Sequence, residues 1–118
     1  MKQILHFSLY QEDHKILEEQ LKGEWNQSQI FFQQGEMNHI LDLKEETFLR
    51  ENEDYSFFLD FKNKKCHLNL KKENNTLQVN VIYAIILQNK NEIELSYKIE
   101  TQAEEIKMKL VMIGGNES

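Results

Sequence analysis

The feature that most constrains this chain is an alternation of apolar and polar residues, with a period of two, along almost its whole length. Near the start, Leu5, Phe7 and Leu9 alternate with polar neighbours, and the pattern returns at residues 92–100 and 106–112. Successive side chains of a β-strand point to opposite faces, so this alternation is typical of strands that bury one face. The sequence therefore predicts antiparallel strands with one solvated side.

Further strand candidates fill the middle of the chain, and short polar segments such as residues 33–36 and 62–65 connect them. Strands that recur every 8–12 residues or so predict a barrel or a sandwich, and the absence of proline suits unbroken ladders. We predict an all-β fold, an antiparallel meander closed into a barrel of about eight to ten strands. The domain is expected to span residues 1–113, with residues 114–118 as a flexible C-terminal tail.

One segment leaves two alternatives open. Residues 13–23 would form a short helix if Asp13 served as its N-cap and Gly23 followed its last turn. As a strand, the same segment would place Leu17, Leu21 and Gly23 on one face, with Glu19 as the exception. Periodicity alone favours neither.

The stretch from Val79 to Leu87 is apolar on both faces, and a strand of this kind must be covered on both. Strict alternation predicts one set of residues facing the interior: Val79, Val81, Tyr83, Ile85 and Leu87. It predicts an outer set of interface candidates: Ile82, Ala84 and Ile86. Either a helix or loop of the same chain covers this outer set, or a second copy covers it in a homodimer. Phe31, Ile40 and Phe58 also fall on the outer face of their strands.

The net charge and the length of the apolar runs limit which kinds of partner the protein can bind. Lys and Arg total 14 against 20 Asp and Glu, and the net charge of −6 argues against nucleic acid or an anionic membrane as a partner. The longest apolar run, Val81 to Leu87, is far too short for a membrane span. A single cysteine, Cys66, excludes an internal disulfide and suits a reducing compartment. The N-terminus carries no apolar signal segment, so we expect a cytoplasmic protein.

Motifs for catalysis and metal binding are absent from the sequence. The histidines His6, His14, His39 and His67 are not spaced as a ligand set, and adjacent Cys66 and His67 would point to opposite faces of a strand. No nucleophile elbow and no glycine-rich phosphate loop occurs. The sequence predicts no metal, no cofactor and no catalytic residue, and hence a protein that is not an enzyme.

The order of the strands resembles the YwiB-like bacterial proteins, a family of unknown function with a lipocalin-like (calycin) β-barrel. The resemblance is carried by the strand Leu5–Leu9, the charged stretch Lys15–Gly23, the strand Ile30–Phe32, the segment Phe48–Asn52 with Arg50, and the hairpin of residues 92–110. It implies a strand rather than a helix at residues 16–25, and it brings no catalytic residues. Gly23-Glu24-Trp25 also looks like the Gly-x-Trp of lipocalins, whose Trp closes one barrel end against an arginine.

A closed meander of this size can enclose a ligand, and the resemblance to calycins implies that use. We therefore predict that the barrel binds a small hydrophobic or amphipathic ligand in its lumen. The lumen candidates are Trp25, Phe32, Arg50, Tyr83 and Tyr97, with Arg50 as the polar anchor. The alternative is a non-catalytic interaction module that forms a homodimer through the outer apolar face.

Overall fold

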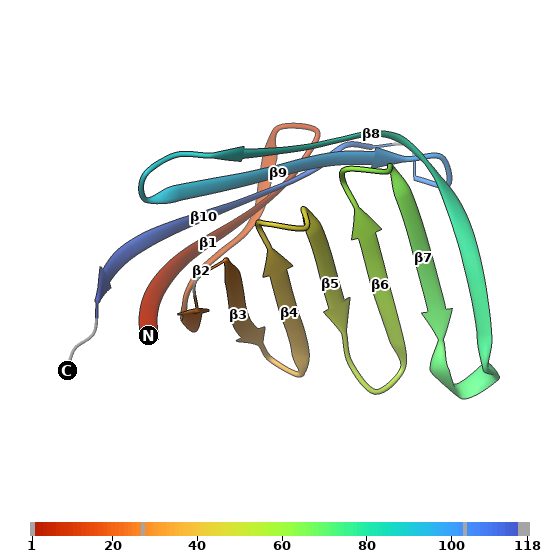
Figure 1. The fold of residues 1–118 in the computed structure, drawn as a ribbon, viewed down its shortest axis with the longest axis horizontal. Coiled ribbons are helices and arrows are strands. Elements are labelled where there is room, and N and C mark those ends of the chain that lie inside the picture. Colours follow the sequence, from red (N-terminus) through yellow and green to blue (C-terminus); the bar gives the residue numbers. More distant parts are fainter. Residues whose placement is uncertain (1, 27, 103, 116–118) are drawn as a thin grey trace.

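Strands make up almost all of the regular structure. The computed structural model describes residues 2–26, 28–102 and 104–115. The strands are β1 (Lys2–Gln11), β2 (His14–Asn26), β3 (Gln29–Gln34), β4 (Met37–Asp42), β5 (Thr47–Glu51), β6 (Tyr55–Asp60), β7 (Lys65–Leu70), β8 (Asn75–Gln88), β9 (Glu92–Ile99) and β10 (Ile106–Gly115) (Figure 1). A single 3-10 turn, η1 (Lys71–Glu73), joins β7 to β8. No helix in these described ranges has the length and apolar character needed to cross a bilayer.

Each strand pairs antiparallel with the next one in the chain, and β1 pairs with β10 to close a ten-stranded barrel. The predicted all-β meander barrel is therefore confirmed, and its shape is consistent with a lipocalin-like barrel. The helix considered for residues 13–23 does not form, because the segment pairs with β1 from His14 onward. At the other end, β10 runs to Gly115, two residues past the expected domain limit, and residues 116–118 lie outside the described residues.

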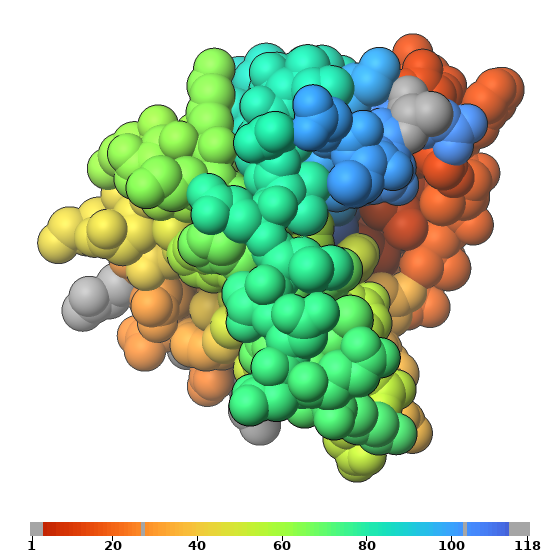
Figure 2. All heavy atoms as spheres, turned by 90° about the vertical axis from the view of Figure 1, so that its right-hand side faces the viewer, coloured from red at the N-terminus to blue at the C-terminus, as the bar shows by residue number. Residues whose placement is uncertain are grey.

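Two long strands form the corners of the barrel by changing partners along their length. Residues 14–24 of β2 pair with β1, and residues 23–26 pair with β3. In β8, residues 75–80 pair with β7 and residues 81–88 pair with β9. Figure 1 shows β8 bending over at the right, and Figure 2 shows it rising across that side of the molecule to its top.

Gly23 marks the corner in β2. A Cβ at this position would lie 2.5 Å from Cδ1 of Leu5 and 3.0 Å from the carbonyl oxygen of Phe31. Both distances are shorter than ordinary contacts, so the absence of a side chain lets β2 approach β1 and β3 closely. The glycine that ends the charged stretch of the sequence is therefore required by the packing at this bend.

The barrel interior contains one row of tightly packed apolar side chains from five successive strands. These residues are directly paired across β3 to β7, and each is at most 1% exposed. We call them the apolar row: Ile30, Leu41, Phe48, Leu59 and Cys66. Phe7, Leu95 and Met108 supply buried side chains from the strands of the opposite wall. Together these residues form the hydrophobic core that stabilises the barrel.

A β-bulge in β8 overturns the predicted orientation of its second half. The register shifts between Val81 and Tyr83, which leaves Ile82 as an extra residue opposite β9. After the bulge, alternation resumes with the opposite phase, so Ala84 and Ile86 pack against the core. Of the three interface candidates, only Ile82 is exposed. Tyr83, predicted to face the lumen, pairs instead with Lys98 on the outer face, and Ile85 and Leu87 are exposed.

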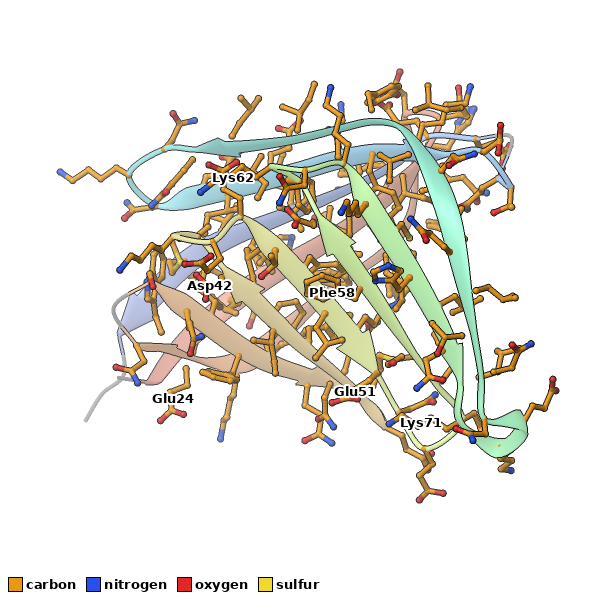
Figure 3. The ribbon with its side chains drawn as sticks, turned by 45° about the vertical axis from the view of Figure 1, so that its right-hand side comes forward. Glu24, Asp42, Glu51, Phe58, Lys62 and Lys71 are labelled. Atoms are coloured by element: carbon orange, nitrogen blue, oxygen red, sulfur yellow. The ribbon has the colours of Figure 1, made fainter. Side chains whose placement is uncertain are left out.

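The outer face of β3 to β6 carries a second apolar row. Phe31, Ile40, Leu49 and Phe58 are directly paired across these strands and are half-buried. Figure 3 shows Phe58 near the middle of this face, where its ring lies nearly parallel to that of His67 at 6.4 Å. The outward placement predicted for Phe31, Ile40 and Phe58 is confirmed, and each side chain is only partly exposed to solvent.

Short polar side chains shape the turns at the ends of these strands. Asp42 accepts hydrogen bonds from the backbone N–H groups of Lys44 and Glu45, and Asp60 accepts from those of Lys62 and Asn63. These bonds, chiefly that from Glu45, hold the pKa of Asp42 below its usual value. Both carboxylates are therefore turn-forming groups.

Candidate ligand site in the barrel interior

A row of mixed character lies next to the apolar row, two residues further along the same five strands. Its members are directly paired and face the interior, because they alternate in phase with the apolar row. We call them the polar row: Phe32, His39, Arg50, Phe57 and Leu68. An arginine and a histidine at neighbouring interior positions are exceptional, since such groups are rarely buried without partners.

His39 is only 2% exposed, and its ring lies among the aromatic rings of Phe7, Phe32 and Phe48. Its ring stacks on that of Phe32, with centroids 4.4 Å apart and planes 5° from parallel. Neither Nδ1 nor Nε2 has a hydrogen-bond partner in the part of the chain that the structure describes. Burial, followed by the charge of Arg50, lowers the pKa of His39 to about 4. The imidazole is therefore neutral at pH 7, with one nitrogen that donates and one that accepts.

Arg50 is the cross-strand neighbour of His39 and the only arginine in the sequence. Its Cζ lies 5.3 Å from the centroid of the Phe57 ring, a distance at which a guanidinium is attracted to the aromatic face. Its buried Nε has no hydrogen-bond partner among the described residues, and none of their carboxylates forms an ion pair with it. Among the described residues, Arg50 is thus a half-buried cation without a counter-ion.

Tyr97 approaches the same place from β9 on the opposite wall. It is buried, and its ring centroid lies 5.7 Å from that of Phe57. Burial raises the pKa of Tyr97 to about 12, although the charge of Arg50 acts in the opposite direction. His39, Arg50 and Tyr97 therefore form one group of interior polar side chains, which we call the polar cluster.

A hollow of about 460 Å³ reaches this region through the wall of the barrel. Strands β2 and β3 pair only from Gly23 and Phe32 to Asn26 and Gln29, and beyond the Gly23–Phe32 pair they separate. The hollow lies at this separation and opens to solvent. Its lining consists of Lys22, Gly23, Glu24, Phe31, Phe32, Gln33, Asn38, His39, Ile40 and Glu51. Two members of the polar row, Phe32 and His39, therefore contribute to its surface.

A second hollow, of about 500 Å³, adjoins the first and is more polar. The two share Gln33, Asn38 and Glu51. Glu51 is paired there with Lys71, whose Nζ lies 3.2 Å from Oε1 of the carboxylate, and both residues lie at the lower margin in Figure 3. Since its lining includes three glutamates, the second hollow is a poor site for an anion.

The structure gathers three of the five predicted lumen residues. Phe32, Arg50 and Tyr97 meet at the polar cluster, as described above. Trp25 is half-buried and packs against the core beside Ile30, at the end of the apolar row. Tyr83 lies outside the barrel, where its hydroxyl donates a hydrogen bond to Oε2 of Glu105 at 2.5 Å. That bond is the main reason why the pKa of Tyr83 rises to about 12.

Sequence reasoning considered His39 only as a metal ligand and missed its place in the site. A usable signal was present, because His39 lies two residues after Met37 and two before Leu41, which puts it on the same strand face as these two apolar residues. The residues described by the structure contain no group of three or more His, Cys, Asp or Glu that could hold a metal ion. Cys66 is fully buried, and burial raises the pKa of its thiol to about 11.

No family model matches this chain, and comparisons with curated proteins and with solved structures found no match. Its function must therefore be argued from the geometry of the site.

Proposed function

We propose that the barrel binds a small amphipathic anion, with the anionic head at the polar cluster and the apolar body in the hollow between β2 and β3. The observation that carries the proposal is the pairing of Arg50, which has no counter-ion, with His39, which has no hydrogen-bond partner within the described residues. A buried polar atom is costly when unpartnered, so the imidazole of His39 and the Nε of half-buried Arg50 both favour a ligand that supplies oxygen acceptors.

The chemistry of the cluster favours an anion over a neutral or cationic ligand. Arg50 offers N–H donors in a planar fork that matches a carboxylate, and neutral His39 supplies one further donor. Phe32 and Phe57 flank these groups with aromatic faces. A flat, weakly hydrated head such as a carboxylate would replace water there with charge-assisted hydrogen bonds.

The hollow suits the rest of such a ligand. Its volume lies within the range of small-molecule sites, and Phe31, Phe32 and Ile40 supply apolar surface. Lys22 stands at its edge as a second cation, although Glu24 and Glu51 oppose it. Because the apolar row fills the adjacent interior, the ligand must be small or lie partly in the open hollow. This is a proposal for binding without catalysis.

The test uses decanoate as the anionic probe, with decanol and decyltrimethylammonium as neutral and cationic probes of the same chain length. Calorimetric titration of the purified protein should detect decanoate binding, at least about tenfold tighter than either other probe. Arg50→Met keeps an unbranched apolar stem and removes the guanidinium with its charge, and it should weaken decanoate binding about 10- to 100-fold.

Lys62→Met is the matched control, because it removes the same charge from an exposed turn far from the hollow. It should leave the affinity for decanoate unchanged. Failure of the wild-type protein to bind decanoate, or equal binding by the Arg50→Met variant, would contradict the proposal.

A further inference from the structure

One half of the barrel wall ends in two strand edges. Residues 14–22 of β2 pair with β1 alone, and residues 81–88 of β8 pair with β9 alone. In Figure 1, this part of β8 runs along the top of the ribbon beside β9. An edge of this kind presents main-chain N–H and C=O groups that another strand can bind.

The two edges differ in whether their side chains discourage pairing with a strand of another chain. The β2 edge carries Lys15, Glu18, Glu19 and Lys22, and charged side chains of this kind discourage pairing with another chain. The β8 edge carries none, and no charged residue occurs between Glu73 and Lys90. The β2 edge is therefore protected, and the β8 edge is not.

Exposed apolar side chains accompany the unprotected edge. The bulge at Ile82 turns Ile85 and Leu87 outward, and these three residues are 54%, 48% and 56% exposed. The only helical segment among the described residues is η1, which lies beside β6. No helix of the described chain therefore covers the β8 edge, which removes the helix from the two kinds of cover, helix or loop, that the sequence had left open.

We propose that residues 82–88 of two copies pair antiparallel about a twofold axis, so that one sheet runs through a homodimer. Only an extended chain can satisfy a row of main-chain donors and acceptors, which makes a β-strand the partner. An antiparallel pair of identical strands is self-complementary, as a twofold interface requires.

Charge favours a second copy in particular. Each chain has a net charge of −6, so two copies repel each other overall. The segment between Glu73 and Lys90 is the longest without charge in the sequence, and it lets two copies meet without opposing like charges. The paired strands would extend for roughly 23 Å, at about 3.3 Å per residue.

The test measures mass in solution by sedimentation velocity over a range of concentrations. The wild-type protein should form a dimer of twice the 14.2 kDa chain mass. Ile85→Lys places a charge on the edge without disturbing the core, since this side chain points outward, and should shift the protein to monomer. Ile16→Lys is the matched control, because Ile16 is 53% exposed on the β2 edge, and this variant should remain dimeric.

A second measurement keeps the proposal testable if the lysine variant does not fold. Hydrogen exchange of the wild-type protein should show amides of residues 82–88 that become protected as concentration rises, whereas amides of residues 14–22 should not change. A wild-type monomer at every concentration would overturn the proposal. A dimeric Ile85→Lys protein, dissociation by Ile16→Lys, or exchange at residues 82–88 that is independent of concentration would overturn it as well.

Discussion

The apolar row and the polar row are built by the same five strands, face the same interior and lie two residues apart. The apolar row contains only side chains that bury well, and its members are almost completely excluded from solvent. The polar row instead has polar side chains at two of its five positions, His39 and Arg50. Within the described chain, Nδ1 and Nε2 of His39 and Nε of Arg50 have no hydrogen-bond partner. We infer from this difference that the apolar row stabilises the barrel, whereas the unpartnered polar atoms of the polar row lower its stability.

That cost points to use of the site. Replacing a buried polar group with an apolar one of similar shape is often neutral or stabilising. The need to fold therefore poorly explains why His39 and Arg50 stand next to each other without hydrogen-bond partners in the described chain. Substitutions in the two rows test this difference directly.

Leu59→Ala in the apolar row should lower the free energy of unfolding by about 3 kcal/mol, because Leu59 is fully buried and leaves a cavity. Leu68→Ala removes the same atoms from the half-buried end of the polar row and should cost only about 1 kcal/mol. Urea denaturation of both variants measures the difference. Equal costs would show that the two rows are packed alike.

Acid should destabilise the protein through His39. Its pKa is about 4 when folded and about 6.5 when unfolded, so the unfolded chain binds more protons between these values. The contribution of neutral His39 is therefore complete above pH 6.5 and is lost as the pH falls towards 4, by roughly 3 kcal/mol. Denaturation at several pH values measures this loss.

His39→Phe should remove that part of the pH dependence while keeping the stack on Phe32. His14→Phe, at the exposed start of β2, is the control and should keep the wild-type profile. A His39→Phe protein that loses as much stability between pH 6.5 and 4 as the wild type would refute the role assigned to burial.

Arg50→Met should change the free energy of unfolding by less than about 1 kcal/mol, and the change should be a gain. The substitution removes a charge that has no counter-ion among the described carboxylates and keeps much of the packing on Phe57. Thermal and urea denaturation without ligand measure it. A loss of several kcal/mol would instead make Arg50 a structural residue.

The last prediction concerns the access of a thiol reagent to Cys66, which substitution and stability measurements do not report. Cys66 belongs to the apolar row, where burial raises its pKa to about 11 and the reactive thiolate is scarce. Ellman's reagent should leave the native protein unmodified over hours and should react at once in concentrated guanidinium chloride. Rapid reaction of the native protein would show that the apolar row opens to solvent.

The sequence predicted the fold well where a strand has one buried face. Leu5, Phe7 and Ile93 were assigned inward by alternation alone and are at most 1% exposed. It failed at β8, where both faces are apolar and alternation cannot reveal an inserted residue. The bulge at Ile82 therefore reversed Tyr83, Ala84 and Ile86, because backbone pairing with β9 rather than hydropathy decides the phase there.

The candidate site was only partly predictable for a related reason. Arg50 was selected because it is the only arginine and ends a strand, and Phe32 and Tyr97 because they lie on apolar stripes. His39 was missed, since a lone histidine carries no motif. Its importance depends on the ring of Phe32 stacked on it and on Arg50 across the ladder.

By itself, the amino-acid order determined that this chain forms antiparallel strands and which side of most strands is buried, because those properties depend on neighbours one or two positions away. Only the tertiary structure decided where β2 and β3 separate and that His39, Arg50 and Tyr97 converge. It also decided which two strand edges, in β2 and in β8, stay unpaired. These outcomes depend on the closure of the barrel, which brings together residues that are distant in the chain.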